Sequence, residues 1–357
     1  MEDIIMRKKL VTVLLTVAMT ASLLAGCGSG KSEDAGDKKA DGASSGEKVE
    51  LIFTSVSVSG DSHTKAMQEF ADKVEELSDG SVTCKTYSDG TLFSSENEFD
   101  ALLSGEADLA YISFQTLSTQ SGLEWCSMFG SGYFWDSYDH MTGTLNGETG
   151  QEIFDKISDN VNCKPLSAFY LGSRIINTRA KEVNKYEDMS GQLLRMPNSE
   201  AWLNLGEALG ANPTPLSFSE LYTALQTGAV DAQDNPLPTC ISAKFYEVAP
   251  YFAITNHVVD SVIPCINTDT WNSMSEDQQK AVTEAMEYAR TTNDEARIAD
   301  EESAIETLES EGCTVTYPDL KAFKEKVTAY YEGHDDQTST WDMDMYNKIQ
   351  DEGAKYE

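Results

Sequence analysis

Positively charged residues are scarce in this sequence of 357 residues. Lys and Arg together number 26 against 60 Asp and Glu, which gives a formal net charge of −34. A negative field of this size repels nucleic-acid phosphates and anionic lipid headgroups, so no nucleic acid is expected as a partner. A small anionic ligand stays compatible with this composition, provided that a few cationic groups are held in a closed pocket.

Proline is also scarce, at 9 residues, and the chain is 40% hydrophobic and 24% charged. This composition excludes a fibrous or disordered chain, and the length is sufficient for two packed domains. The motifs His-Glu-x-x-His, Gly-x-Gly-x-x-Gly and Cys-x-x-Cys are absent. We therefore expect no metal site and no cofactor.

The cysteines are too widely spaced to indicate a metal centre. Six of them follow Cys27, and no two of these six lie closer than 25 residues. An exported protein can form disulfides, and the spacing alone does not select a pairing. Three of the six lie in apparent strands, where a buried free thiol is the simpler interpretation: Cys84, Cys163 and Cys313.

The first 26 residues are predicted to be a secretory signal peptide. Basic residues at 7–9 precede an apolar stretch at 10–24 that is too short and too polar for a transmembrane helix. The sequence Leu24-Ala25-Gly26-Cys27 resembles the lipobox of bacterial lipoproteins. This resemblance implies lipidation of Cys27 and an anchor on the outer face of the cell membrane. The alternative is an ordinary signal peptide with a chance cysteine.

Residues 27–48 are predicted to comprise the lipidated cysteine and a flexible tether. Over 28–47 the only apolar side chains are three alanines, among Gly, Ser, Lys, Asp and Glu. Such a segment buries too little apolar surface to offset the entropy lost on ordering. A tether of this length would hold a folded domain clear of the lipid headgroups.

Strands and helices alternate from residue 50 onward. Ser95 and Glu98 have the spacing of a capping box at the start of a helix. The alternation requires crossover connections, and hence a parallel sheet covered on both faces. The expected elements are a strand at 50–58, a helix at 62–77, a strand at 81–87, a helix ending near 105 and a strand at 108–113.

A second α/β unit follows an aromatic loop at 125–135. Ser217 and Glu220 again have capping-box spacing, for a helix that Gly228 ends. The other expected elements are a helix at 148–158, strands at 164–170 and 191–196, a helix at 199–209 and a strand at 229–233.

A very long helical pattern runs from residue 276 to about 311, capped by Ser275 and Gln278 and stopped by Gly312. At about 1.5 Å per residue such a helix is more than about 50 Å long, which exceeds the diameter of one small domain. We therefore expect this helix to bridge both α/β units.

A hydrolase is one hypothesis for the function. Gly60-Asp61-Ser62 follows a strand and opens a helix, as the nucleophile block of GDSL-type hydrolases does. The histidine base of that family has an Asp three residues before it, and no histidine of this chain does. Ser62 is therefore interpreted as a helix cap, and hydrolysis through Ser62 is the alternative function.

Three of the five arginines that follow residue 26 fall within 22 residues: Arg174, Arg179 and Arg195. Arg195 lies between apolar residues in a strand that looks buried, so its guanidinium group must be paired. The partner is either an acidic side chain of the protein or a ligand carboxylate, which a guanidinium binds in a bidentate fork. The residue types alone leave both options open.

The chain resembles the solute-binding proteins of TRAP (tripartite ATP-independent periplasmic) transporters, in their dicarboxylate-binding, DctP-type branch. The resemblance extends from about Val49 to Tyr331 and is densest at 195–199 (RMPNS), 210–215 (GANPTP) and 218–236. Ala232 and Asp234 depart from the glycine and glutamate that are usual in the family.

This resemblance implies a two-domain, hinged, periplasmic-binding-protein-like α/β fold with the ligand between the domains. It also implies a monomeric transport protein, not an enzyme, with an organic acid and the membrane subunits of a TRAP transporter as partners. The implied segments are domain I at 49–172 with a return at about 261–295, domain II at 173–260 with a return at about 296–335, and a C-terminal tail at 336–357.

The resemblance also assigns the ligand site. Arg195 matches the arginine that forms a salt bridge with the ligand carboxylate, and Arg174 matches a second arginine that assists it. Asn235 matches the asparagine that hydrogen-bonds the same carboxylate, and Phe218 matches an aromatic residue packed against the ligand. Arg179 has no counterpart role.

The rest of the pocket is expected from loops at the carboxyl ends of the first strands, at 57–63 and 113–115, with the aromatic loop 125–135 nearby. These loops are rich in Ser, carry one His and one Gln, and contain no Arg or Lys. A second carboxylate would find no cation there, whereas hydroxyl groups would find hydrogen bonds. We therefore expect a hydroxylated monocarboxylate, such as a sugar acid, in preference to a plain dicarboxylate.

Overall fold

The computed structural model describes residues 47–356. The predicted signal peptide, Cys27 and nearly all of the tether lie outside the described residues. Within them, no helix has the length and apolar character needed to cross a membrane.

The first three strands form the parallel group that the alternation predicts. β1 (Val49–Thr54) pairs in parallel with β2 (Val82–Tyr87) and with β3 (Leu109–Ile112). The crossover helices are α1 (Ser62–Leu77), which has the predicted bounds, and α2 (Glu98–Ser104).

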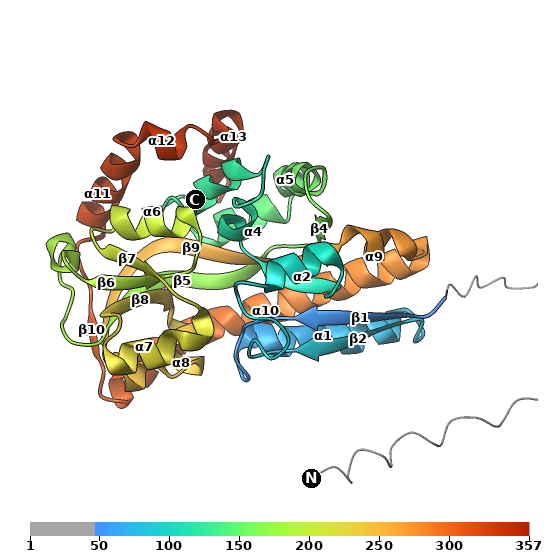
Figure 1. The fold of residues 1–357 in the computed structure, drawn as a ribbon, viewed down its shortest axis with the longest axis horizontal. Coiled ribbons are helices and arrows are strands. Elements are labelled where there is room, and N and C mark those ends of the chain that lie inside the picture. The colour runs from blue at the N-terminus through green and yellow to red at the C-terminus, as the bar shows by residue number, and fades with distance from the viewer. Residues whose placement is uncertain (1–46, 357) are drawn as a thin grey trace, which may run out of the picture. The chain divides into compact units, whose positions relative to one another are not determined.

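Two long antiparallel strands join this group to the rest of the sheet (Figure 1). β9 (Tyr251–Asn267) pairs with β3 and, over most of its length, with β5 (Phe169–Thr178). β9 was not among the elements expected from the sequence, and the single strand expected at 164–170 is split between β4 (Cys163–Pro165) and β5. The sheet order is β2-β1-β3-β9-β5-β8-β6-β7, so the sheet is mixed and not parallel throughout.

Parallel strands recur at the other end of the sheet. β6 pairs in parallel with β7 and β8, and β8 pairs antiparallel with β5. Short helices connect these strands. The bounds are β6 (Leu193–Met196), α6 (Glu200–Ala208), β7 (Asn212–Pro215), α7 (Leu221–Thr227), β8 (Ala232–Pro236) and α8 (Leu237–Ser242).

The predicted long helix is confirmed as α10 (Glu276–Ser310), a helix of 35 residues. Ser275 and Gln278 form the expected capping box at its start. α10 packs against α1, β5 and α8, and so spans both groups of strands (Figure 1). In its middle the fully buried Arg297 donates hydrogen bonds to Asp61, which caps α1, and to the carbonyl of Leu171 in β5.

The aromatic segment at 125–135 belongs to the hydrophobic core. Phe129 stacks on Phe114 with ring centroids 4.0 Å apart, and Ile349 of the C-terminal helix joins the same cluster. The remaining elements are α3 (Phe114–Leu117), α4 (Tyr138–Leu145), α5 (Glu148–Ser158), α9 (Thr268–Ser273), β10 (Thr314–Thr316), α11 (Leu320–Glu332), α12 (Asp335–Thr338) and α13 (Met343–Gly353).

Two of the predicted capping boxes are wrong. The N-cap of α2 is Asn97, and the Glu98 side chain is buried instead of reaching back to Ser95. α7 begins only at Leu221, after a 3-10 turn at Phe218–Glu220 without a side-chain cap. In both places the Ser-x-x-Glu spacing is present, but the Ser and Glu side chains do not form the hydrogen bonds of a capping box.

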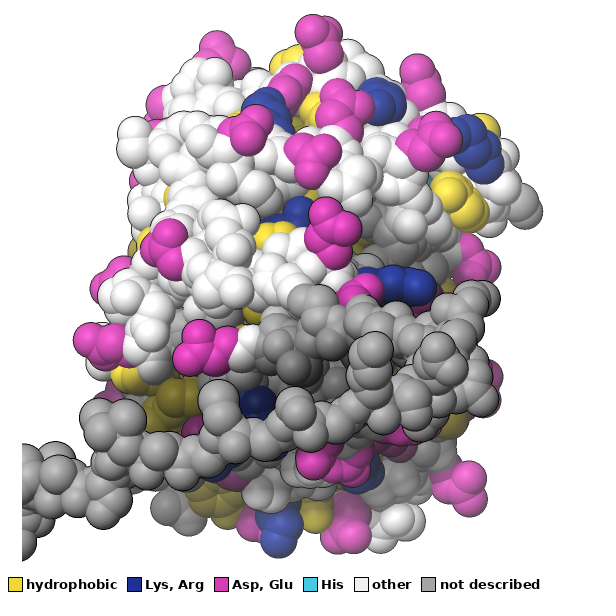
Figure 2. All heavy atoms as spheres, turned by 90° about the vertical axis from the view of Figure 1, so that its right-hand side faces the viewer, with side chains coloured by type: hydrophobic (Ala, Val, Ile, Leu, Met, Phe, Trp, Pro, Cys, Tyr) yellow, Lys and Arg dark blue, Asp and Glu magenta, His cyan; other side chains and the backbone are white. Residues whose placement is uncertain are grey.

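Within the described residues, the six cysteines that follow Cys27 form no disulfides, and acidic side chains predominate over basic ones on the face shown in Figure 2. All six cysteines after Cys27 are free thiols; Cys163 is buried, and Cys84 and Cys313 are half-buried. Asp and Glu side chains are spread over the face shown in Figure 2, with Lys and Arg at scattered positions. Any anion-binding site in the described part of the chain is therefore expected in a recess and not on this surface.

Candidate functional site

The site is a cavity of about 410 Å³ where the two groups of strands meet. Its wall includes the residues that follow β3, together with residues at the carboxyl ends of β6 and β8. Ligands of open α/β sheets bind at such strand ends, and this volume suits a small molecule. All four residues assigned from the resemblance line the cavity: Arg174, Arg195, Phe218 and Asn235.

Arg195 is a buried cation without an ionic partner. Its side chain on β6 is 2% exposed, and its Nε donates a hydrogen bond to the carbonyl of Leu216 at 2.8 Å. Among residues 47–356, no carboxylate lies within salt-bridge distance of it. Burial lowers the pKa of Arg195 to about 10, with Asp234 opposing this effect, so the group stays charged at neutral pH. The Phe218 ring centre lies 6.0 Å from its guanidinium carbon.

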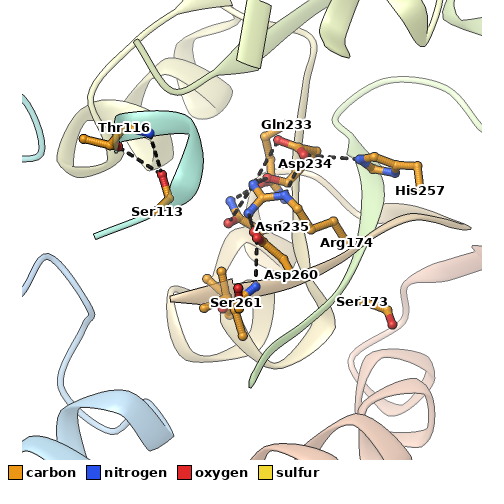
Figure 3. Close-up of polar contacts among 12 residues, drawn as sticks. Ser113, Thr116, Ser173, Arg174, Gln233, Asp234, Asn235, His257, Asp260 and Ser261 are labelled. Carbon is orange, nitrogen blue, oxygen red and sulfur yellow. Dashed lines mark hydrogen bonds and ion pairs between the residues drawn. The ribbon is translucent and has the colours of Figure 1, made fainter. Parts of the chain in front are cut away.

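Arg174, in contrast, is held by acidic groups of the protein (Figure 3). Its Nε donates to Asp234 Oδ2 at 2.7 Å and its Nη1 to Asp260 Oδ2 at 2.9 Å. Its Nη2 donates to the carbonyl of Asp234 and to Asn235 Oδ1. The guanidinium carbon also lies 4.5 Å from the ring centre of Trp202, a cation–π contact. The sequence left open whether a buried arginine pairs with an acidic side chain of the protein. Arg174 does so, whereas Arg195 does not pair with any among residues 47–356.

The two acids on Arg174 differ in their surroundings. Asp234 also accepts a hydrogen bond from His257 Nε2 at 3.2 Å, while His257 Nδ1 contacts Thr255 Oγ1 at 2.8 Å. Although burial opposes ionisation, Arg174 and His257 hold the pKa of Asp234 well below its usual range. Asp260 faces the cavity, and burial raises its pKa despite the contact with Arg174.

Asn235 is oriented by its neighbours. Its amide nitrogen donates to Gln233 Oε1 at 2.7 Å, and its oxygen accepts from Arg174. Arg179 does not line the cavity, and its Nε donates to the carbonyl of Leu225 at 3.0 Å.

The opposite wall differs in part from the expectation. Of the segments 57–63, 113–115 and 125–135, only Ser113 lines this cavity. Ser113 accepts a hydrogen bond from the backbone N–H of Thr116 at the start of α3 (Figure 3). The rest of this wall comes from residues in and next to α2 and α3, and from the first and third strands and their ends: Val56, Ser95, Glu96, Glu98, Phe99, Asp100, Tyr111, Ile112, Thr116, Thr119 and Gln120.

Among the lining residues that sequence reasoning missed are Glu98, Trp202 and Asp260. Asp260 had a signal, because it is the only charged residue in a mostly apolar run at 258–266. Glu98 was interpreted as a capping residue, and Trp202 gave no signal because nothing distinguishes it from the other apolar residues of its helix. The wall therefore carries four acids, Glu96, Glu98, Asp100 and Asp260, against two arginines.

Ser62 is not arranged for catalysis. The residue that caps α1 is Asp61, whose carboxylate accepts a hydrogen bond from the backbone N–H of His63, so the helix-cap interpretation of Ser62 is wrong. Ser62 Oγ is buried and has no hydrogen-bond partner in the described part of the chain. The His63 ring contacts Asp61 at 2.9 Å through Nδ1.

Comparison with known proteins places the chain in a family. The model of the DctP family, bacterial extracellular solute-binding protein family 7, matches residues 53–337. The chain is 33% identical over 265 residues to the sialic acid-binding periplasmic protein SiaP of Vibrio cholerae, a match that covers 74% of this chain and 82% of SiaP.

Solved structures agree with this match. A TRAP periplasmic solute-binding protein from Roseobacter denitrificans with bound 3-deoxy-D-manno-oct-2-ulosonic acid is 34% identical, with a TM-score of 0.80 and coverage of 86% of this chain and 100% of that chain. The sugar acid-binding protein DctPAm of Advenella mimigardefordensis, in complex with galactonate, is 26% identical, with a TM-score of 0.81 and coverage of 87% and 100%.

These matches confirm the periplasmic-binding-protein-like α/β fold and exclude the alternative of a serine hydrolase, because the family is one of non-enzymatic binding proteins. The chain belongs to the DctP family of bacterial extracellular solute-binding proteins, the extracytoplasmic solute receptors of TRAP transporters.

Proposed function

We propose that this receptor captures a sugar acid and that the ligand carboxylate pairs with Arg195. The observation that carries this proposal is the contrast between the two arginines of the cavity. Arg174 is neutralised by Asp234 and Asp260, whereas Arg195 is equally buried and has no carboxylate partner within the described residues. A buried, unpaired guanidinium group is costly, and a bidentate carboxylate removes that cost.

The neighbouring residues would complete the carboxylate site. Asn235 lies beside Arg174, which fixes the amide oxygen and leaves an amide N–H free to donate to the same carboxylate. Arg174, whose charge Asp234 and Asp260 already balance, would assist by holding Asn235. Phe218 would pack against the body of the ligand next to Arg195.

A sugar acid fits the rest of the cavity better than a dicarboxylate does. The wall built by α2 and α3 offers Ser and Thr hydroxyl groups and acidic side chains but no Lys or Arg. A second ligand carboxylate would meet like charges there, and such juxtapositions cost several kcal/mol, on the order of 100-fold or more in affinity. Structural relatives hold L-galactonate and β-D-glucuronate, although one holds succinate.

Transport would proceed by closure of two domains, 49–172 and 173–260 with their returns, around the ligand. Delivery to the membrane subunits of the TRAP transporter would follow. Lipidation of Cys27, outside the described residues, would keep the receptor at the outer face of the membrane near these subunits.

Ligand binding should stabilise the purified protein against heat. At a ligand concentration one hundred times the dissociation constant, the stabilisation is about 2.7 kcal/mol. We expect sugar acids in a panel of organic acids, amino acids and neutral sugars to raise the Tm. A panel in which neutral sugars raise the Tm and acids do not would contradict a carboxylate ligand.

Calorimetry with D-glucuronate, D-galactonate and succinate should rank the two ligand classes. Because the second carboxylate of succinate would face the acidic side chains of Glu96 and Asp100 and, among the described residues of that wall, no Lys or Arg, we expect it to bind about 100-fold more weakly than the better sugar acid. Tighter binding of succinate would overturn the choice of a sugar acid and leave the carboxylate site at Arg195 standing.

A further inference from the structure

A second buried polar group lines the same cavity and comes from α2, whereas Arg195 comes from β6. Glu98, the first residue of α2, is 5% exposed, and its Oε1 has no hydrogen-bond partner among residues 47–356. Burial raises the pKa of Glu98 to about 8, and the neighbouring hydroxyl group of Thr54, itself without a hydrogen bond of normal geometry in the described part of the chain, opposes this shift. A buried polar atom without a partner costs free energy in the unliganded protein, and a ligand that supplies the partner recovers it.

Glu98 differs from the other acids of the cavity. Glu96 and Asp100 are exposed to solvent, and Asp260 is bound to Arg174 and to the backbone N–H of Ser261. Within the described structure no Lys or Arg forms a salt bridge with Glu98, so Arg195 and Glu98 do not neutralise each other. The cavity therefore presents an unpaired cation from β6 and an unpaired carboxyl group from α2.

We propose that Glu98 is a specificity-determining residue that hydrogen-bonds a hydroxyl group of the ligand whose carboxylate pairs with Arg195. The inference rests on the proposed function and adds the residue that recognises the other end of the ligand. A hydroxyl group can donate to the ionised carboxylate and can both donate to and accept from the neutral acid. A ligand ammonium group would instead require full ionisation, which burial opposes.

The hydroxyl-bearing surroundings of Glu98 suit the same ligand chemistry. Ser95, Ser113 and Thr116 line this wall, and Ser113 and Thr116 hydroxyl groups lie 3.0 Å apart. These groups can bond further hydroxyls, whereas none of them compensates a second carboxylate as a cation would. A polyhydroxylated acid can thus satisfy both buried groups at once.

The test compares Glu98→Leu and Glu98→Gln with a matched control, Glu106→Gln, an exposed acid just after α2 that does not line the cavity. Calorimetry uses D-glucuronate, D-galactonate and hexanoate. We expect Glu98→Leu to weaken binding of the better sugar acid about 10- to 100-fold, Glu98→Gln to lose less because its amide still hydrogen-bonds, and Glu106→Gln to bind as the wild type does. In Glu98→Leu the ratio of the affinity for the sugar acid to the affinity for hexanoate should fall by the same factor as the affinity for the sugar acid.

The Tm of each variant separates a lost contact from a lost fold. Glu98→Leu should be no less stable than the wild type, since a buried, unpartnered carboxyl group is removed. Unchanged sugar-acid binding by Glu98→Leu would overturn the role of Glu98 and leave the proposed carboxylate site at Arg195 standing. The wild type could instead bind D-glucosaminate more than tenfold more tightly than D-gluconate, and Glu98→Gln could lose this preference. Glu98 would then bind a ligand ammonium group, and the assignment of a hydroxyl group would be overturned. Failure of the wild type to bind any acid would overturn the proposed function itself.

Discussion

Replacing Arg195 with Ala should abolish detectable binding of every organic acid without lowering the stability of the unliganded protein. Truncation of one partner of a desolvated, hydrogen-bonded ion pair costs about 2 to 5 kcal/mol, on the order of 30- to 5,000-fold in affinity. Because burial lowers the pKa of Arg195 below its unfolded value, the charged group destabilises the folded state throughout the neutral range. Its removal therefore relieves a cost that only a bound carboxylate otherwise offsets.

Calorimetry with the sugar acids and a thermal melt without ligand check both parts of this result. Arg195→Lys should restore binding only in part, because a single ammonium group lacks the planar fork of the guanidinium. Arg179→Ala is the matched control, since Arg179 lies outside the cavity and donates to a backbone carbonyl. Equal losses of affinity at both arginines, or a fall in Tm for Arg195→Ala, would mean that Arg195 is a structural residue.

The helices were the most predictable part of this fold. α1, α5 and α10 have the bounds that apolar periodicity and end signals indicate, to within a residue. These signals are local, because a cap and a helical stripe lie within one stretch of chain. β9 carries no such signal: it is buried over most of its 17 residues and pairs with strands far away in the sequence.

The clustering of the candidate residues was predictable, but their contacts within the protein were not. The resemblance brought Arg174, Arg195, Phe218 and Asn235 to one place, and the structure has them around one cavity. It could not tell that Arg174 is already neutralised, because Asp260 comes from a strand that was not expected. Likewise, Glu98 faces the cavity because α2 begins two residues later than the capping pattern indicates.

Replacing Arg174 with Met should destabilise the protein strongly. Arg174 is the cation of two buried carboxylates, and removal of one partner from a buried ion pair typically costs about 3 to 5 kcal/mol. For a chain of this size each kcal/mol shifts the Tm by about 2 to 4 °C, so a fall of about 10 °C is expected. Met retains an apolar contact with Trp202, which confines the change to the lost charge.

The loss should shrink as the pH falls. In the wild type the pKa of Asp234 is depressed, so its contribution to stability is present above the unfolded pKa of about 4 and is lost at lower pH. In Arg174→Met the burial of Asp234 would raise that pKa instead, and protonation below it would relieve the cost. Thermal melts between pH 7 and pH 4 should therefore show the two Tm curves approaching each other.

Arg195→Met is the matched control for this prediction, because it removes an equally buried guanidinium from the same cavity but leaves no carboxylate without its partner. We expect a lower Tm for Arg174→Met only, and a loss of ligand affinity for both variants, since Asn235 would lose the group that fixes its amide oxygen. A Tm for Arg174→Met equal to that of Arg195→Met would show that Asp234 and Asp260 are neutral in the folded protein. The assignment of Arg174 as a structural residue and of Arg195 as the ligand-binding residue would then be wrong.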